Sequence, residues 1–326
     1  MRVLVVGGAG FIGSHVAWRL HESGFTPVIF DNFSTGFRSF VDRYEVIDAG
    51  LADYPALRMA LRGVGAVIHL AARAYVDESL VKPREYYETN VSCALNLLNA
   101  TVDAGVTKFV FSSSCTVYGN PARLPIDEET PRSPISPYGQ SKAILEDALK
   151  YYGGAYGLRF VALRYFNAAG GDKSEEIGES HYPETHLIPR VLQAAAGITG
   201  PIRIFGVDYD TPDGTCVRDY VHVNDLADGH VSALRFLLHG GDSDIINLGS
   251  GTGLSVLEII SAAERATRLP VPKVVFPRRP GDPPVLFANV ERARSRLHWS
   301  ARRGLPEIID SAWKWQQRIH ESRLCA

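Results

Sequence analysis

Short apolar runs alternate with stretches of helical periodicity through the first half of the chain. Val3–Val6 and Pro27–Phe30 have the unbroken apolar character of strands that are buried on both faces. An alternation of strands and helices predicts the α/β class, with a doubly wound parallel sheet and helices on both faces. We expect further strands at Tyr44–Asp48, Ala66–Ala71, Lys108–Ser114 and Arg159–Asn167, and helices at Ser14–Glu22, Tyr54–Arg62, Arg84–Ala104 and Ser136–Tyr152.

The pattern changes after Ala168, where glycine, proline and acidic residues accumulate and the strict alternation stops. We therefore expect a first domain over residues 1–168 and a second, smaller α/β lobe over residues 169–326. About residues 219–249 are expected to return to the first domain. The elements that favour this return are a helix and a strand, at Val221–Leu237 and Ile245–Gly249.

Three glycines stand between the first strand and the first helix, in the spacing GxxGxxG at Gly7, Gly10 and Gly13. Gly7 permits a tight turn, Gly10 lets the main chain approach a pyrophosphate, and Gly13 lets the helix pack on the strand. Asp31 ends the next strand, at the place of a ribose-binding carboxylate. The combination predicts a Rossmann-type dinucleotide site, and the carboxylate of Asp31 favours NAD over NADP, because it would repel a 2′-phosphate.

Polar residues end several of the expected strands, and ligands of open parallel sheets bind beyond the carboxyl ends of the strands. Asp31 and Asp48 end two strands, and Ser112–Ser114 and Asn167 end two more. Each of them alone is equally well explained as a cap of a strand or turn. Their common placement favours a ligand-binding edge.

A tyrosine and a lysine, Tyr138 and Lys142, lie four residues apart on an expected helix and therefore share one face. A nearby ammonium and the positive nicotinamide of NAD⁺ both favour the phenolate of a tyrosine, whose pKa near 10 otherwise makes it a poor base. Ser114 ends a strand 24 residues upstream and offers a hydroxyl to the same substrate oxygen. The three predict proton transfer for hydride chemistry at an alcohol carbon; the alternative is a surface tyrosine and lysine on one helical turn.

Composition removes several classes of function. The 34 Lys and Arg nearly balance the 36 Asp and Glu, so no nucleic-acid partner is expected. No apolar run reaches membrane-spanning length, and Met1 leads directly into a strand, so neither a membrane span nor a signal peptide is expected. The four cysteines, Cys93, Cys115, Cys216 and Cys325, follow no disulfide or CxxC spacing, which suits a cytoplasmic protein.

The chain resembles the extended short-chain dehydrogenases/reductases, and among them the UDP-glucose 4-epimerases, over nearly its whole length. Several matching segments are typical of nucleotide-sugar enzymes rather than of the wider fold. The segments that carry the resemblance are Val6–Ser14, Phe111–Gly119, Ser136–Lys142, Leu163–Gly170, Pro183–Pro189, Asp213–Gly229 and Arg278–Asp282.

The resemblance implies an NAD-dependent enzyme that inverts C4 of a UDP-hexose through a 4-keto intermediate while NAD stays bound. It implies that Tyr138 is the base, with Lys142 as its partner and Ser114 on the sugar hydroxyl. The cofactor set that it implies is Gly7, Gly10, Phe11, Ile12, Gly13, Asp31, Asn32, Ser34, Thr35, Gly36, Asp48, Ala49, Leu70, Ala71, Ala72, Arg73, Thr89, Tyr138, Lys142 and Phe166. The UDP-sugar set is Ser114, Tyr138, Asn167, Leu187, Arg203, Phe205, Arg218, Arg279 and Asp282.

The sequence departs from the family pattern at a few positions. Arg73 stands where relatives often carry a lysine that reaches the cofactor, and His186 stands where some have an asparagine. His181 and His186 lie near Glu179 and Glu184, but their spacing fits no common ligand pattern, so no metal is predicted.

Other functions remain open from the sequence. The substrate could be another UDP-sugar, such as UDP-N-acetylglucosamine, UDP-xylose or UDP-glucuronate. Related dehydratases place Asp-Glu after the fifth strand, where this chain has Cys115-Thr116, so dehydration is disfavoured. A non-enzymatic NAD-binding protein is disfavoured because Ser114, Tyr138 and Lys142 are all present.

Two further expectations rest on the resemblance. A homodimer is expected, because the helices Arg84–Ala104 and Ser136–Tyr152 are more apolar than one buried stripe requires and pair in relatives. Leu286 takes the position, four residues after the Gly281-Asp282 anchor, that borders the C2 substituent of the sugar in relatives. A leucine there predicts a partly opened pocket, with UDP-glucose and UDP-galactose preferred and UDP-N-acetylglucosamine accepted more slowly.

Overall fold

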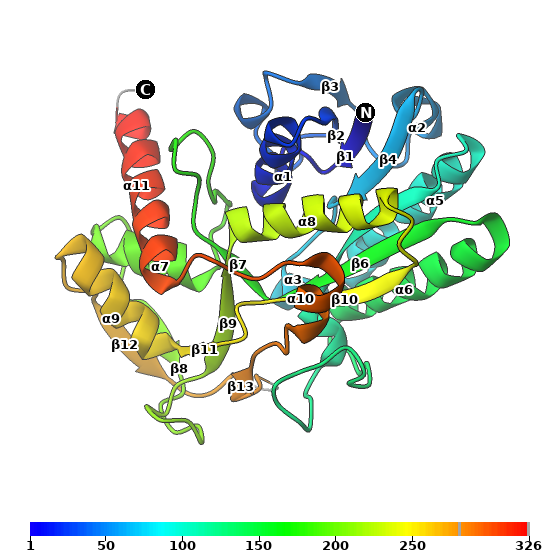
Figure 1. Ribbon diagram of the computed structural model, residues 1–326. Coiled ribbons are helices and arrows are strands. Elements are labelled where there is room, and N and C mark those ends of the chain that lie inside the picture. Colours follow the sequence, from blue (N-terminus) through cyan, green and yellow to red (C-terminus); the bar gives the residue numbers. More distant parts are fainter. Residues whose placement is uncertain (280–281, 325–326) are drawn as a thin grey trace.

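The computed structural model describes residues 1–279 and 282–324 (Figure 1). Seven parallel strands form its main sheet in the spatial order β10-β6-β5-β4-β1-β2-β3. This order and the flanking helices confirm the doubly wound α/β class. The strands are β1 (Arg2–Val6), β2 (Thr26–Asp31), β3 (Glu45–Asp48), β4 (Val64–His69), β5 (Lys108–Ser114), β6 (Arg159–Tyr165) and β10 (Asp244–Leu248).

Strand β1 shows why the apolar runs are unbroken. Successive side chains of a strand point to opposite faces, so a sheet that is covered on both faces needs apolar residues at every position. Val3 and Val5 join the core that includes Leu20 of α1 (Phe11–Glu22) and Leu234 of α8 (Val223–Leu238). Leu4 and Val6 join the core on the other face, beneath α2 (Tyr54–Ala60), α5 (Cys93–Asp103) and α6 (Pro137–Tyr156).

The helix expected at Arg84–Ala104 is interrupted. α3 (Val76–Val81) and α4 (Pro83–Tyr87) come first, and a π-helical turn at Glu88–Ser92 then leads into α5. The turn contains Asn90, whose buried amide bridges the segment after β4 to α6. A local widening of a helix often marks a functional segment, and here it places Asn90 beside the loop that follows β4.

A second part of the chain carries two small sheets (Figure 1). β7 (Asn167–Ala169), β9 (Val217–His222), β11 (Gly253–Ser255) and β13 (Val285–Leu286) form one, and β8 (Ile202–Phe205) pairs with β12 (Lys273–Phe276) in the other. Around them lie α7 (Leu187–Ala195), α9 (Val256–Thr267) and α11 (Leu305–Leu324), which share one core; α10 (Glu291–Leu297) packs by β10 and α8. The strand expected at Arg159–Asn167 ends at Tyr165, and Asn167 instead opens β7 beside Tyr220 of β9.

The chain crosses from the second part back to the main sheet before it ends. α8 packs on α1, where Asp228 pairs with Arg19, and β10 pairs with β6 at the edge of the seven strands. Among the described residues, no helix combines the length and apolar character needed to cross a lipid bilayer.

Candidate active site

The turn after β1 is shaped by glycine. Gly7 has φ 81°, and a Cβ there would lie 2.4 Å from the main-chain nitrogen of Ala71. A Cβ at Gly13 would lie 2.1 Å from the oxygen of Gly7, so the helix packs on the turn only with glycine at that position. At Gly10 the nearest atom, the oxygen of Gly7, is 3.5 Å away, which leaves that side of the turn open.

The carboxylate of Asp31 closes the neighbouring side of this turn. It accepts hydrogen bonds from the main-chain N–H of Ala9 at 2.9 Å and of Phe33 at 2.8 Å. Burial raises the pKa of Asp31, although these N–H donors counteract that effect. Asp48 lies opposite Asp31 in the strand register, with its own carboxylate exposed and paired to Arg38 at 3.5 Å.

The loop after β2 lies against the same turn. A Cβ at Gly36 would approach the carbonyl carbon of Ala9 to 2.8 Å, and Ser34 donates its N–H to the side chain of Asn32 at 3.1 Å. Ala49 donates its N–H to the oxygen of Asp31 at 3.1 Å. Asn32, Ser34 and Thr35 are exposed, so their side chains are available to a ligand.

The loop after β4 completes the cradle. Leu70 and Ala71 both donate their N–H to the oxygen of Val6, at 2.8 and 3.0 Å. Arg73 follows Ala72 and is fixed by Asn90, whose side-chain oxygen accepts its N–H at 2.8 Å. The guanidinium of Arg73 pairs with Glu85 at 2.8 Å and with Glu78 at 3.4 Å, so in this structure it is engaged within the protein.

Together the loops after β1, β2 and β4 fit a dinucleotide. They meet at the point where the strand order reverses, which is where such ligands bind in doubly wound sheets. The open main chain at Gly10 suits a pyrophosphate, the first helical N–H groups at Phe11 and Ile12 are suited to bind an anion, and Asp31 suits a ribose hydroxyl.

The predicted proton-transfer residues come from β5 and α6. Ser114 is the last residue of β5, and Thr116 donates both its N–H, at 3.2 Å, and its hydroxyl, at 2.9 Å, to the Ser114 oxygen. Tyr138 and Lys142 lie one turn apart on α6, and Lys142 Nζ is 5.7 Å from the centre of the Tyr138 ring. The structure therefore brings these residues together at the carboxyl end of β5.

Burial acts in opposite directions on the two titratable groups. It raises the pKa of Tyr138 to about 12, although a hydrogen bond with Ser114 counteracts it. It lowers the pKa of Lys142 to about 7, although the charge of Glu146 favours the ammonium. Lys142 Nζ donates to the main-chain oxygen of Ser112 at 2.7 Å, which fixes its side chain beneath the ring.

A buried network supports this set, and sequence reasoning did not find it. Glu146 is fully buried and accepts from Ser113 at 2.6 Å and from two nitrogens of Arg164 at 2.8 and 2.6 Å. Asn90 donates to the hydroxyl of Ser141 at 3.1 Å. The available signal was helical spacing, because Glu146 follows Lys142 by four residues on one face of α6.

The residues predicted to hold UDP lie in the second part of the chain. Arg218 forms an ion pair with Asp282, and the guanidinium carbon of Arg279 is 4.0 Å from the centre of the Phe205 ring. Arg203 shares one face of β8 with Phe205 and stacks on Phe276 at 5.2 Å. Pro280 and Gly281, between these anchors, lie outside the described residues.

These anchors connect to the end of β5. Cys115, which follows Ser114, packs on the same buried cluster as Leu286; burial raises the pKa of the Cys115 thiol to about 12, and the positive charge of Arg218 counteracts this. Leu286 of β13 pairs in register with Arg218 and packs on the cluster that contains Phe166. Asn167 and Leu187 open β7 and α7 and are both partly buried.

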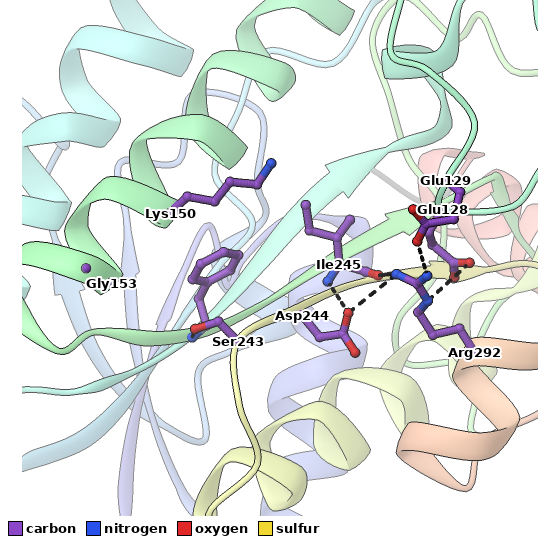
Figure 2. A pocket seen from close by; sticks show the side chains of 10 residues that line it. Glu128, Glu129, Lys150, Gly153, Ser243, Asp244, Ile245 and Arg292 are labelled. Carbon is purple, nitrogen blue, oxygen red and sulfur yellow. Dashed lines mark hydrogen bonds and ion pairs between the residues drawn. The ribbon is translucent and has the colours of Figure 1, made fainter.

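A surface pocket of about 480 Å³ lies elsewhere, at the amino ends of β6 and β10 (Figure 2). Arg292 there pairs with Glu128, Glu129 and Asp244, so its charge is already matched. The residues that line it, Glu128, Glu129, Lys150, Gly153, Gly154, Phe160, Ser243, Asp244, Ile245 and Arg292, include none of the predicted site.

Comparisons with known proteins agree with this geometry. Residues 3–249 match the NAD dependent epimerase/dehydratase family. The chain is 48% identical to a UDP-glucose 4-epimerase of Rhizobium leguminosarum bv. trifolii over 321 residues, which is 98% of each chain.

Two solved structures are also closely similar. The UDP-glucose 4-epimerase of Brucella ovis in complex with NAD is 47% identical, with a TM-score of 0.94 over 96% of this chain and 97% of that one. The enzyme of Stenotrophomonas maltophila with bound NAD and formylated UDP-arabinopyranose is 40% identical, with a TM-score of 0.96 over 99% of each chain.

Proposed function

This chain belongs to the NAD dependent epimerase/dehydratase family, and we propose that it is a UDP-glucose 4-epimerase, which interconverts UDP-glucose and UDP-galactose. The observation that carries the proposal is the convergence of Ser114, Tyr138 and Lys142 at the carboxyl end of β5, on the edge of the sheet that holds the glycine turn. A dinucleotide cradle alone would serve many oxidoreductases, but this set supplies a base at an alcohol carbon.

Tyr138 is the proposed base. Its phenolate takes the proton of the C4 hydroxyl, Ser114 donates a hydrogen bond to the same oxygen, and Lys142, whose ammonium form is favoured by Glu146, lies beneath the ring. When bound, NAD⁺ accepts the C4 hydride and returns it, and its positive nicotinamide favours the phenolate. After the 4-keto sugar has turned its other face to the hydride donor, Tyr138 gives the proton back to the C4 oxygen.

Anchoring of the nucleotide lets the sugar turn while the substrate stays bound. Guanidinium groups suit a pyrophosphate because they bind phosphate oxygens in pairs. The Arg218–Asp282 pair and the Arg279–Phe205 stack, together with Asn167, Leu187 and Arg203, are the proposed UDP-binding residues. In this proposal residues 1–168, with the returning segment 219–249, hold NAD, and the rest of residues 169–326 hold the UDP-sugar.

The dehydratase alternative is weaker. Elimination of water needs an acid at the end of β5, and Cys115 and Thr116 occupy that place. The hydroxyl of Thr116 donates to Ser114, and burial keeps the Cys115 thiol protonated by raising its pKa to about 12. Neither side chain is a carboxylic acid.

We also propose a homodimer through α5 and α6. Leu98 and Leu149 are buried within one chain, so part of the apolar excess is covered internally. Tyr151 and Tyr156 of α6 nevertheless remain 80% and 59% exposed, and Tyr87 of α4 remains 38% exposed. Static light scattering at micromolar concentration tests the assembly, and a monomer mass would refute it. The cytoplasmic location expected from the cysteine pattern stays a prediction.

One incubation tests the function. Purified protein is mixed with UDP-galactose and NAD⁺, the products are separated, and their masses are measured by mass spectrometry. We expect UDP-glucose of unchanged mass and no net accumulation of NADH. A product that has lost one water would indicate a dehydratase instead, and unaltered UDP-galactose would indicate a binding protein.

A further inference from the structure

A loop between β7 and α7 gathers four side chains with metal-ligating atoms. Glu179, His181, Glu184 and His186 each offer one such atom, and these atoms all lie within 4.8 Å of one another. The spacing Glu-x-His-x-x-Glu-x-His resembles no common ligand motif, yet the fold of the loop places two imidazoles against two carboxylates. None of the four belongs to the proton-transfer set.

Three of the four His–Glu distances in the cluster are close to the spacing of ligand atoms around a tetrahedral ion. Metal–ligand bonds of about 2.0–2.1 Å in a tetrahedron separate the ligand atoms by roughly 3.3–3.4 Å. His181 Nδ1 lies 3.5 Å from an oxygen of Glu179 and 3.5 Å from an oxygen of Glu184. His186 Nδ1 lies 3.4 Å from the other oxygen of Glu184 and 2.7 Å from Glu179, so the last pair has to open by roughly 0.6 Å when the four side chains close on an ion.

The two carboxylates of the cluster are buried and therefore need a positively charged partner. The side chains of Glu179 and Glu184 are only 5% and 8% exposed, and a buried carboxylate is costly unless a cation compensates it. A proton on His186 is one possible cation, since its Nδ1 is within hydrogen-bond distance of Glu179. That arrangement still leaves His181 Nδ1 buried without a hydrogen-bond partner, although it points at both carboxylates.

We propose that Glu179, His181, Glu184 and His186 bind one divalent transition-metal ion, zinc above all, in a closed structural site. Two imidazole nitrogens select against Mg²⁺ and Ca²⁺, which prefer oxygen ligands only. Four protein ligands fill a tetrahedral ion, so no position stays open for a reacting water. The proposal replaces the sequence-based expectation of no metal, and it does not depend on the proposed enzymatic activity.

The surroundings of the cluster define what the ion would hold together. The His181 ring meets Phe11, the first residue of α1, edge to face at 6.4 Å between ring centres. Tyr75, which precedes α3, stacks on His186 at 6.3 Å and meets His181 at 5.9 Å. An ion at this site therefore fixes the loop before α7 against the segments that follow β1 and β4.

Main-chain hydrogen bonds already orient one of the four side chains. Glu184 accepts the main-chain N–H groups of Thr185, at 2.8 Å, and His186, at 2.9 Å, through one carboxylate oxygen. Such outer hydrogen bonds fix ligand direction in metal sites. The residue after His186 begins α7, so the ion would also anchor the start of this helix.

The first test measures bound metal in untagged protein from zinc-supplemented growth, by inductively coupled plasma mass spectrometry. We expect about one transition-metal ion per chain in the wild type and at least a ten-fold lower content in the double variant His181→Ala/His186→Ala. The matched control is His239→Ala, an exposed histidine at the end of α8, which should retain the wild-type content. Metal contents that do not differ between the double variant and the control overturn the proposal.

A second test uses the wild type alone, so it does not depend on how a variant folds. Protein stripped with a chelator is titrated with Zn²⁺ against a chromophoric competitor, and its Tm is recorded with and without the ion. We expect saturation at about one Zn²⁺ per chain and a Tm higher by several degrees, because an ion that binds only the folded state stabilises it. Stripped wild type that takes up no Zn²⁺, with an unchanged Tm, overturns the proposal.

Discussion

The ammonium of Lys142 lies beneath the ring of Tyr138, 5.7 Å from its centre. Burial lowers the pKa of the lysine to about 7 and raises that of the tyrosine to about 12, so both side chains are pushed toward their neutral forms. A base at this position therefore needs additional positive charge nearby before it is active at neutral pH.

Tyr138→Phe removes the phenolic oxygen while keeping the ring on α6. We expect kcat to fall by roughly 10²- to 10⁴-fold, the range typical of a general base, while NAD binding is retained. Turnover is measured by product analysis and NAD content by absorbance of the denatured protein. Tyr151→Phe, at an 80% exposed position of the same helix, is the control and should keep full activity. Near-normal turnover of Tyr138→Phe would refute the assignment of the base.

Asp31→Ser tests cofactor selection. Loss of a charged hydrogen bond to the ribose, worth about 1.5–3 kcal/mol, should weaken NAD binding by roughly 10- to 150-fold and narrow the preference over NADP. Binding of both cofactors is measured by titration calorimetry. Asp42→Asn, an exposed change just before β3, serves as the control. An unaltered NAD to NADP ratio in the serine variant would contradict the role of Asp31.

Arg164→Met tests the buried network below the site. Glu146 is fully buried, and loss of Arg164 leaves its carboxylate only the longer pair with Arg132 at 3.3 Å, so we expect the free energy of unfolding to fall by up to about 3–5 kcal/mol. The matched control is Arg2→Met, which breaks a 2.8 Å pair with Glu45 whose side chains are 37% and 51% exposed. Solvent screens the charges of this exposed pair, so the free energy of unfolding of the control is expected to fall by about 0–1 kcal/mol. Urea denaturation measures both, and equal losses would contradict the prediction.

Leu286→Tyr tests substrate breadth. Leu286 packs on the cluster below the site, and a larger side chain there should narrow the space beside C2 of the sugar. Forcing an acetamido group against a filled wall costs about 1–3 kcal/mol, which is roughly a 5- to 150-fold loss of kcat/KM. We expect this loss for UDP-N-acetylglucosamine relative to UDP-glucose, with Leu286→Met as the size-matched control. An unchanged ratio between the two sugars would show that Leu286 does not limit the pocket.

His230→Leu tests the pH dependence of stability. His230 is fully buried, and burial lowers its pKa to about 4, although its hydrogen bond to Leu226 counteracts this. The unfolded chain binds the proton first as pH falls below about 6.5, so stability is lost between about pH 6.5 and 4. In that window the free energy of unfolding of the leucine variant should change less steeply with pH, by up to about 1.4 kcal/mol per pH unit. Urea denaturation from pH 7 to 5 measures it, and His239→Leu, at an exposed position, should leave the slope unchanged.

The main sheet could be predicted because its strands need no partner to be identified. A strand covered on both faces must be apolar at each position, and Val3–Val6 carries that requirement in its own sequence. Strands such as Val285–Leu286 are two residues long and gain their identity only from pairing with Val217–Arg218. Nothing local in the sequence specifies that pairing.

The candidate site likewise contains residues that the sequence predicts and residues that only the folded structure brings together. Gly7 and Gly13 could be predicted because their function is to avoid a Cβ, which a sequence motif records directly. The engagement of Arg73 by Glu85, and the turn that places Asn90, depend on how separate helices pack. The four-residue cluster around His181 likewise exists only after its loop has folded back on itself.

The position of β10 at the outer edge of the seven strands has a consequence for synthesis. On the ribosome, residues 1–165 emerge with six strands of the sheet, but β6 keeps an open edge and α1 keeps an uncovered apolar face until α8 and β10 have left the exit tunnel. Unpaired edges and exposed apolar faces are what drive wrong association of nascent chains. A translational pause before β10 has left the tunnel would thus prolong a state prone to aggregation, whereas a later pause would leave all seven strands paired.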